Sequence, residues 1–349
     1  MIKGLIAPIC AAAVLGAAAL TPSLATPTHA ATALQGAGSS FDFPFFDSAF
    51  KAYAKSHDVT VNYQPVGSGA GIQNFTQKLV DFGATDVPLN PVKEEPAAVK
   101  AGGPVQQIPV ALGGVSIAIN VPGIKSGALN LDGLTLAKIY LGTITKWNDP
   151  AIKRLNKKLK LPDLTITVVH RADSSGTSYA FTDYLGKVSD QWRGLVGTSK
   201  SPSWPTGVGG QANLGVAQLV QQTSGAIGYV ELAYVLQNHM KEAAIKNASG
   251  VYQVPTPKTV AADAAAFPKV SATKFSIANG KGKNAYPICT YSWALVFRNQ
   301  PDATKGKALV ALMNWVVTTA QTKYAKPLDY VPLPSSIQKL GLGLLKQVK

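Results

Sequence analysis

The sequence is poor in charged residues, cysteine and histidine. Only 15% of its 349 residues are charged and 46% are hydrophobic, a balance that excludes an intrinsically disordered chain. Two cysteines and four histidines leave little material for a metal site, and neither a paired-cysteine spacing nor an H-E-x-x-H motif occurs. The sequence therefore predicts no disulfide framework, no metal centre and no cofactor.

Motifs of nucleophilic and nucleotide-dependent enzymes are also missing. The chain has no G-x-x-x-x-G-K-[ST] loop and no G-x-S-x-G elbow, and no histidine lies near Cys289 in the sequence. A small buried core position is therefore the expected role of Cys289. His170 is expected to face solvent at the end of a strand. We predict that the protein is not an enzyme.

Acidic residues are scarce relative to basic ones. The sequence holds 33 Lys and Arg against 18 Asp and Glu, a formal net charge of +15. This charge suits anionic partners, from nucleic acid to small anions, but the basic residues are scattered or paired and form no nucleic-acid motif. We expect a solvated basic surface and no nucleic-acid partner.

Long apolar runs are absent after the first thirty residues. Lys3, the alanine-rich stretch 5–20 and the small-residue site Thr28-His29-Ala30 are typical of a secretory signal, and the apolar stretch is short for a membrane span. The predicted signal peptide covers residues 1–30. Cleavage near Ala30 would export the mature chain to the periplasm.

Three turns rich in glycine and serine, residues 36–41, 67–71 and 173–178, each follow a predicted strand and open a predicted helix. The free N–H groups and the positive dipole end of a helix N-terminus favour an anion. If the three helix N-termini converge, they form one anion pocket. Each turn taken alone is also compatible with a simple tight turn or helix cap.

The third turn carries the strongest signal. Arg171 offers a guanidinium fork that suits tetrahedral oxyanions, Ser175 and Thr177 offer hydroxyl groups, and Gly176 allows the backbone to approach closely. The alternative is that Ser175 only caps the helix and that Arg171 forms a surface ion pair with Asp173.

The order of predicted elements favours an α/β protein. Strands alternate with helices, and the length exceeds that of a typical single domain. The spacing of Ile72, Phe75, Leu79 and Phe82 predicts a helix, and a helix with a following turn is expected over residues 136–147. Residues 105–121 predict two strands separated by Gly113-Gly114, where the chain would leave the first domain.

Four motifs follow one another along the chain. Residues 36–41 match G-A-G-[AS]-[TS]-F, residues 63–71 match Y-x-x-x-G-S-[GS]-x-G, residues 81–86 match D-F-G-A-[ST]-D, and residues 171–177 match R-x-D-x-S-G-T. This ordered set resembles the periplasmic phosphate-binding proteins of the high-affinity phosphate-specific (Pst) ABC transporter. The similarity extends over nearly the whole chain after the signal.

The resemblance implies a two-lobed type II periplasmic-binding-protein fold, α/β in each lobe, that closes on its ligand about a hinge. Lobe I would comprise residues 31–115 and 290–349, and lobe II residues 116–289. The implied function is to bind inorganic phosphate and to deliver it, as a monomer, to the membrane permease of an ABC transporter. The implied phosphate-binding residues are Ser40, Phe41, Ser68, Asp86, Arg171, Ser175, Gly176 and Thr177, with Asp173 orienting Arg171.

Asp86 would set the specificity of such a site. A buried carboxylate only accepts hydrogen bonds, so its partner must carry a proton. Phosphate keeps at least one P–OH group near neutral pH, whereas sulfate has none. Arsenate is protonated like phosphate, so a binder of another oxyanion remains an alternative, as does a secreted phosphatase that uses the same pocket.

Overall fold

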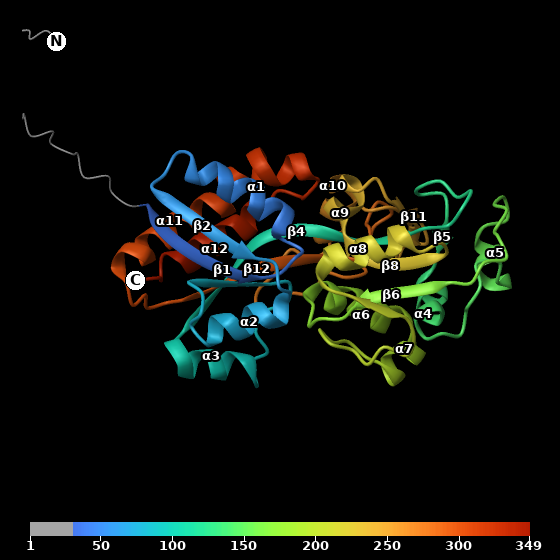
Figure 1. Cartoon of the computed structure of the whole chain (residues 1–349), viewed down its shortest axis with the longest axis horizontal. Helices are drawn as coiled ribbons and strands as arrows, with labels where there is room; N and C mark the ends of the chain where they lie inside the picture. The colour runs from blue at the N-terminus through green and yellow to red at the C-terminus, as the bar shows by residue number, and fades with distance from the viewer. Residues whose placement is uncertain (1–30) are drawn as a thin grey trace, which may run out of the picture. The chain divides into compact units, whose positions relative to one another are not determined.

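A mixed sheet of nine strands is the framework of the computed structural model, which describes residues 31–349 (Figure 1). The strand order is β2-β1-β3-β12-β4-β8-β6-β7, and β9 also pairs with β4. The bounds are β1 Thr32–Gly38, β2 Val59–Gln64, β3 Phe82–Thr85, β4 Val105–Ile119, β6 Thr167–Arg171, β7 Val208–Gly210, β8 Ala226–Glu231, β9 Lys241–Glu242 and β12 Cys289–Phe297. The predicted signal peptide, residues 1–30, lies outside the described residues.

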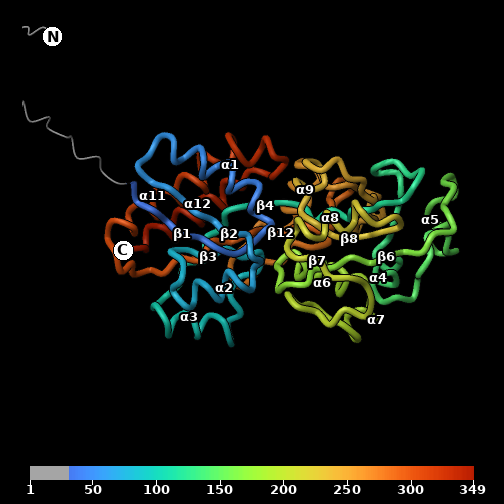
Figure 2. The backbone as a smooth tube through the Cα atoms, in the orientation of Figure 1, coloured from blue at the N-terminus to red at the C-terminus, as the bar shows by residue number. Residues whose placement is uncertain are grey.

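Helices flank this sheet, and a smaller sheet of β11 (Tyr252–Gln253), β10 (Ala244–Lys246) and β5 (Asn130–Leu131) adjoins them (Figures 1 and 2). The alternation of strands and helices confirms the predicted α/β class. The helices are α1 Phe43–Ala54, α2 Ser68–Thr76, α3 Glu94–Gly102, α4 Gly133–Tyr140, α5 Pro150–Leu155, α6 Gly176–Val188, α7 Asp190–Leu195, α8 Ala212–Gln222, α9 Leu232–Gln237, α10 Pro257–Ala264, α11 Ala303–Val317, η1 Gln321–Ala325, η2 Lys326–Leu328 and α12 Ser335–Leu345.

Strand β4 is continuous, so the prediction of two strands split at Gly113-Gly114 is wrong. Its residues 105–114 pair antiparallel with β12, and its residues 115–119 pair antiparallel with β8. The glycines do not end the strand because they make room for neighbours: a Cβ atom on Gly113 would lie 2.7 Å from the ring of Phe41. A single buried strand, β4, therefore connects the part of the sheet that contains β12 with the part that contains β8.

The pairing of β12 with β4 contains an irregularity. Ser292 pairs with Ala111, but the next residue, Trp293, pairs with Pro109, so the register shifts by one residue. Proline has no N–H group for the ladder, and a bulge is one of the few ways in which a sheet accepts it.

One predicted helix ends earlier than expected. The helix α2 stops at Thr76, and Phe82 begins β3 instead of continuing the helix. Lys78 has a left-handed backbone conformation with φ of 59°, which terminates the helix there. Helix α4 ends at Tyr140 and is followed by a turn at Gly142, which has φ of 73°, as predicted. The apolar spacing of the first helix continued past its end because Phe82 is buried in β3, whereas Leu79 lies outside the helix and is 64% exposed.

Aromatic side chains fill the core near both ends of the sheet. Phe46 stacks on Phe50 with ring centroids 4.7 Å apart, and Phe181 stacks on Tyr229 at 4.5 Å. His170 is half-buried and stacks on Trp204 at 4.8 Å, so the expectation that it faces solvent is wrong. Cys289 is buried in β12, as predicted for a core residue.

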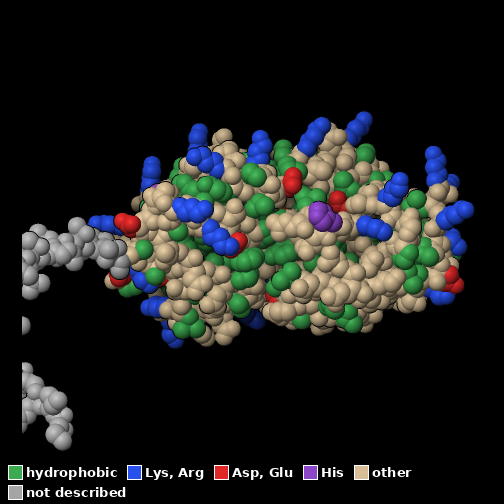
Figure 3. Space-filling view, turned by 45° about the horizontal axis from the view of Figure 1, so that its top comes forward, with side chains coloured by type: hydrophobic (Ala, Val, Ile, Leu, Met, Phe, Trp, Pro, Cys, Tyr) green, Lys and Arg blue, Asp and Glu red, His purple; other side chains and the backbone are tan. Residues whose placement is uncertain are grey.

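Lys and Arg side chains are spread over the face of the molecule in Figure 3 and do not gather in one block, as the sequence predicted for a solvated basic surface. Within residues 31–349, no helix combines the length and the apolar character that a membrane crossing requires. The same residues contain no group of three or more potential metal ligands.

Two glycines inside helices predict opposite effects of the same substitution. A Cβ atom on Gly71 in α2 would lie 2.4 Å from Gly38 Cα, because α2 packs directly against β1, whereas nothing lies within 4 Å of a Cβ atom on Gly343 in α12. We expect Gly71→Ala to lower the free energy of unfolding by several kcal/mol and Gly343→Ala to raise it by up to about 1 kcal/mol. Urea denaturation of both variants tests this expectation, and a stable Gly71→Ala variant would contradict it.

Candidate functional site

The three serine- and glycine-rich turns meet at one place. The N-cap residues of α1, α2 and α6 are Asp42, Gly67 and Ser175. The hydroxyl oxygen of Ser68 accepts a hydrogen bond from the Gly176 N–H at 3.1 Å, which joins the second turn to the third. The side-chain amide of Asn213 donates to Ser40 at 2.9 Å and to Thr177 at 3.3 Å, which joins the first turn to the third. We call Ser40, Ser68, Asp86, Arg171 and Thr177 the cradle; each is 3% exposed or less.

The three hydroxyl groups of the cradle share one pattern: each oxygen accepts two hydrogen bonds from N–H groups of the protein. Ser40 accepts from the backbone and side chain of Asn213, at 3.1 and 2.9 Å. Ser68 accepts from the N–H groups of Asp86 and Gly176, at 3.2 and 3.1 Å. Thr177 accepts from Arg171 at 3.4 Å and from Asn213 at 3.3 Å. Since a hydroxyl has two lone pairs and one proton, each of these groups has one proton left to donate.

Asp86 is the acceptor among these donors. Its Oδ1 atom accepts from the hydroxyl groups of Ser39 and of Ser292, the latter at 2.9 Å, and its Oδ2 atom lies 3.5 Å from Thr177 Oγ1. Desolvation raises the pKa of Asp86 to about 6, although these hydrogen bonds and the positive charge of Arg171 act in the opposite direction. The lack of a side chain at Gly176 allows this approach, because a Cβ atom there would lie 2.4 Å from Asp86 Cβ.

Arg171 and Asp173 form a buried ion pair. The Nε atom of Arg171 donates to Asp173 Oδ1 at 2.7 Å, the Nη2 atom donates to Oδ2, and the two side chains are 1% and 9% exposed. The alternative of a surface pair is therefore wrong. Asp173 also accepts from the Ala212 N–H at 3.0 Å, which fixes its position. The pair keeps the guanidinium group at the cradle but cancels most of its charge.

The other predicted site residues use their groups within the protein. Ser175 accepts from the Ser178 N–H at 3.1 Å and so caps α6, as one alternative held. The N–H of Phe41 donates to the hydroxyl of Ser39 at 3.0 Å. Sequence reasoning missed Ser39, Asn213 and Ser292. Ser39 lies inside a quoted motif and could have been found, whereas Asn213 and Ser292 reach the cradle only through distant pairing of the chain.

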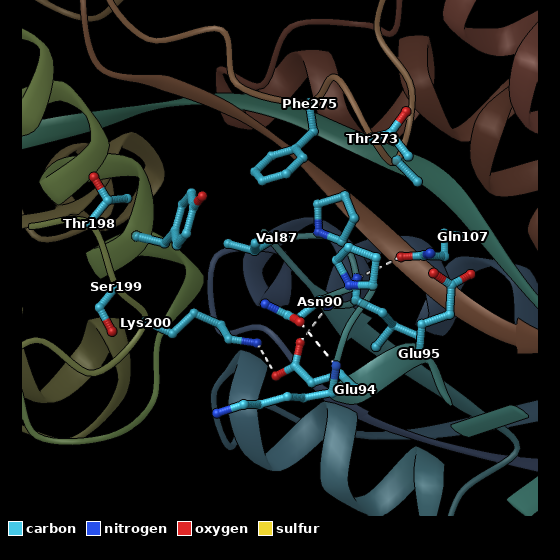
Figure 4. Close-up of a pocket in the computed structure, with 16 residues that line it drawn as sticks. Val87, Asn90, Glu94, Glu95, Gln107, Thr198, Ser199, Lys200, Thr273 and Phe275 are labelled. Carbon is cyan, nitrogen blue, oxygen red and sulfur yellow. Dashed lines mark hydrogen bonds and ion pairs between the residues drawn. The ribbon is translucent and has the colours of Figure 1, made fainter. Parts of the chain in front are cut away.

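A cavity of about 510 Å³ lies beside the cradle (Figure 4). No cradle residue lines it; its walls include Val87 and Asn90 on one side and Tyr179 and Phe275 on the other. Lys200 and Glu94 form an ion pair at this cavity, with side chains 16% and 26% exposed. The backbone oxygen of Lys200 accepts from the Ser175 N–H at 2.9 Å. The ion pair thus joins the segment that follows Asp86 to the segment that supports Ser175.

The architecture is that of the type II periplasmic binding proteins, and a family model described as a PBP superfamily domain matches residues 25–319. A phosphate-binding protein from Stenotrophomonas maltophilia has the same fold, with a TM-score of 0.66 and 21% identity over 90% of this chain and 94% of its own.

Curated relatives define the family more closely. The phosphate-binding protein PstS of Xylella fastidiosa strain Temecula1 is 41% identical over 321 residues, which cover 91% of this chain and 86% of the relative. The PstS protein of Pasteurella multocida is 39% identical over 335 residues, 95% of either chain. The chain therefore belongs to the PstS family of phosphate-binding proteins, which confirms the resemblance noted in its motifs.

The raised pKa of Asp86 predicts that the cradle costs stability in the ligand-free protein. The folded protein holds the Asp86 proton more tightly than the unfolded chain, whose carboxyl has a pKa near 3.8, so this contribution favours folding most at pH 3 to 4 and is lost as the pH rises through 6. We expect Asp86→Asn, which cannot ionise, to be more stable than the wild type at pH 7 by roughly 2 to 3 kcal/mol. The difference should shrink towards pH 4.

Denaturant unfolding at both pH values measures this difference. The buried carboxyl groups of Glu242 and Asp263, which the charge of Asp86 does not influence, titrate alike in both proteins, so their contributions cancel. A variant that is less stable than the wild type at pH 7 would show that the hydrogen bonds of Asp86 outweigh its desolvation.

Proposed function

We propose that this protein binds one inorganic phosphate ion in the cradle and delivers it to the permease of an ABC transporter. The observation that carries the proposal is the pattern of donors and acceptor: Ser40, Ser68 and Thr177 each face a ligand as donors, and Asp86 is an acceptor that needs a proton on its partner. A phosphate ion near neutral pH offers several acceptor oxygens together with at least one P–OH group. The proposed ligand contacts also include Phe41, Ser175 and Gly176.

The electrostatics of the cradle favour hydrogen bonding over net positive charge. Arg171 is paired with Asp173, so an incoming anion meets a nearly neutral ion pair together with oriented hydroxyl groups and helix N-termini. Such a site binds through dipoles that are already held in place by the protein, which costs little reorganisation. The carboxylate of Asp86 then rejects an anion without a proton, because two negatively charged oxygens would face each other with no hydrogen bond between them.

The proposed lobes are residues 31–115 with 290–349, and residues 116–289. Two features support this division. Strand β4 changes its partner from β12 to β8 between Gly114 and Val115. Gly114 pairs with Cys289, so the two places where the chain would pass from one lobe to the other lie side by side. The ion pair of Lys200 and Glu94 would join the two lobes. Closure would bend the sheet where these two strands cross.

The remaining parts of the proposal follow from the family. The curated relatives are named as binding proteins, which supports a role without catalysis. We propose export to the periplasm, with cleavage near Ala30, and a monomeric state in which the permease is the membrane partner. The scattered basic surface supports attraction of small anions and not a nucleic-acid site.

Calorimetric titration tests the proposed function directly. We expect ligand-free protein to bind one equivalent of phosphate at neutral pH and to give no heat with sulfate at the same ionic strength. Binding of sulfate would overturn the role of Asp86, and binding of neither anion would overturn the proposed function. Hydrolysis of a chromogenic phosphate ester by the purified protein would favour the secreted phosphatase instead.

The specificity proposed for Asp86 is tested by a substitution at this residue. We expect Asp86→Asn to reduce the preference for phosphate over sulfate by roughly 10³-fold or more, because the amide offers donors and removes the repelling charge. Asp263→Asn is the matched control, since Asp263 is a second fully buried aspartate whose pKa desolvation raises to about 7, but it contacts Gly280 and not the cradle. Competition between the two anions measures the preference, and an unchanged ratio in Asp86→Asn would remove its role.

A further inference from the structure

Asp42 is a buried carboxyl group next to the cradle that the proposed binding site does not use. It is wholly buried and precedes α1, yet its side chain does not cap that helix. Its Oδ2 atom lies 2.6 Å from Ser292 Oγ, whereas its Oδ1 atom has no hydrogen-bond partner among residues 31–349. A buried, uncapped carboxyl group is costly unless it is neutral or paired.

Ser292 stands between Asp42 and Asp86 with a single proton. Its hydroxyl oxygen lies 2.6 Å from Asp42 Oδ2 and 2.9 Å from Asp86 Oδ1. A hydroxyl group can donate to only one of these oxygens, so two ionised carboxylates would leave one contact without a proton. A proton on one of the two carboxyl groups satisfies both contacts, because that group then donates to Ser292 while Ser292 donates to the other.

Arg171, whose positive charge acts on Asp86, is itself paired with Asp173. Within residues 31–349, neither Asp42 nor Asp86 belongs to an ion pair. The titratable groups whose charges act on Asp42 or feel it are all acids: Asp86, Glu231, Tyr63, Tyr234 and Tyr330. Desolvation and the charge of Asp86 accordingly raise the pKa of Asp42 well above its usual value.

The hydrogen bonds decide which of the two groups carries the proton. Asp86 accepts from Ser39 and Ser292 and lies within the field of Arg171, and all three favour its ionised form. Asp42 has one contact, to Ser292, and one oxygen without a partner. The proton is therefore held more tightly by Asp42.

We propose that Asp42 and Asp86 hold one proton between them through Ser292, and that this proton resides on Asp42 when the cradle binds its anion. Asp42 donates to Ser292, Ser292 donates to Oδ1 of Asp86, and Oδ2 of Asp86 stays an acceptor for the P–OH group. Asp42 and Ser292 are thus positioning residues for the specificity residue Asp86. This role of Asp42 and Ser292 rests on the proposed phosphate-binding function, in which Asp86 selects the anion.

Carbon NMR of the full protein, labelled with ¹³C at the aspartate carboxyl carbons, tests where the proton is. We expect one aspartate resonance of ligand-free protein to keep the chemical shift of a protonated carboxyl group at pH 8. This resonance should be absent from Asp42→Asn and present in Asp263→Asn. Should Asp42→Asn not fold, Ser292→Ala should shift the same resonance, because it removes the acceptor of the Asp42 proton. A wild-type spectrum with only ionised aspartates, or a resonance that survives Asp42→Asn, would overturn the proposal.

Phosphate titration of Ser292→Ala tests the positioning role. The variant removes a donor from Asp86, so the pKa of Asp86 should rise, more of it should be protonated and unable to accept from a P–OH group, and its carboxyl group should lose one of the contacts that hold it in place. We expect the affinity for phosphate to drop about tenfold relative to the wild type at pH 8 and further at pH 6, where more of Asp86 would be protonated.

Ser116→Ala is the matched control, since Ser116 is a buried strand serine that donates to another buried carboxyl group, Glu242, outside the cradle. Equal affinities of the two variants at both pH values would overturn the positioning role. If the wild-type protein bound no phosphate at all, the proposed function would fail, whereas the NMR result would still decide whether the proton is shared.

Discussion

The burial of Asp86 without an ion pair of its own is the constraint on which the cradle depends. A buried carboxylate needs several donors, and the protein places hydroxyl groups there from the first turn (Ser39), the third turn (Thr177) and strand β12 (Ser292). The N–H group of Asp86 in turn donates to the hydroxyl group of Ser68. Because these side chains are linked to one another by hydrogen bonds, removal of one side chain changes the electrostatic environment of the others.

Charge is distributed sparingly around this carboxylate. Arg171 is neutralised by Asp173, and the other acids nearby have only hydroxyl groups and backbone N–H groups as partners. A site with more free cations would bind anions in general and would discriminate poorly among them. The arrangement therefore favours selectivity for a protonated anion over attraction for anions as a class.

The sequence was sufficient for the three turns and for the helices they open, because glycine, serine and apolar spacing are local signals. Arg171 and Asp86 were also within reach, since they stand in ordered motifs. Asn213 and Ser292 were not within reach, because their partners in the cradle are far away in the sequence. Asn213 contacts Ser40, which lies 173 positions earlier, and Ser292 contacts Asp86, which lies 206 positions earlier. The continuity of β4 was missed for a related reason: Gly113 leaves room for the ring of Phe41 and Gly114 for the side chain of Val260, and both neighbours come from elsewhere in the chain.

The bulge at Val110, next to Pro109 in β4, lies close to the site. Side chains alternate between the two faces of a strand, and a one-residue shift in pairing changes which face a given side chain meets. The shift in β12 falls between Ser292 and Trp293, immediately after the hydroxyl group that stands between Asp42 and Asp86. The bulge next to Pro109 thus adjoins the strand residue whose hydroxyl oxygen contacts both carboxyl groups. In this protein, an imperfection of backbone pairing and the chemistry of ligand choice occupy the same few residues.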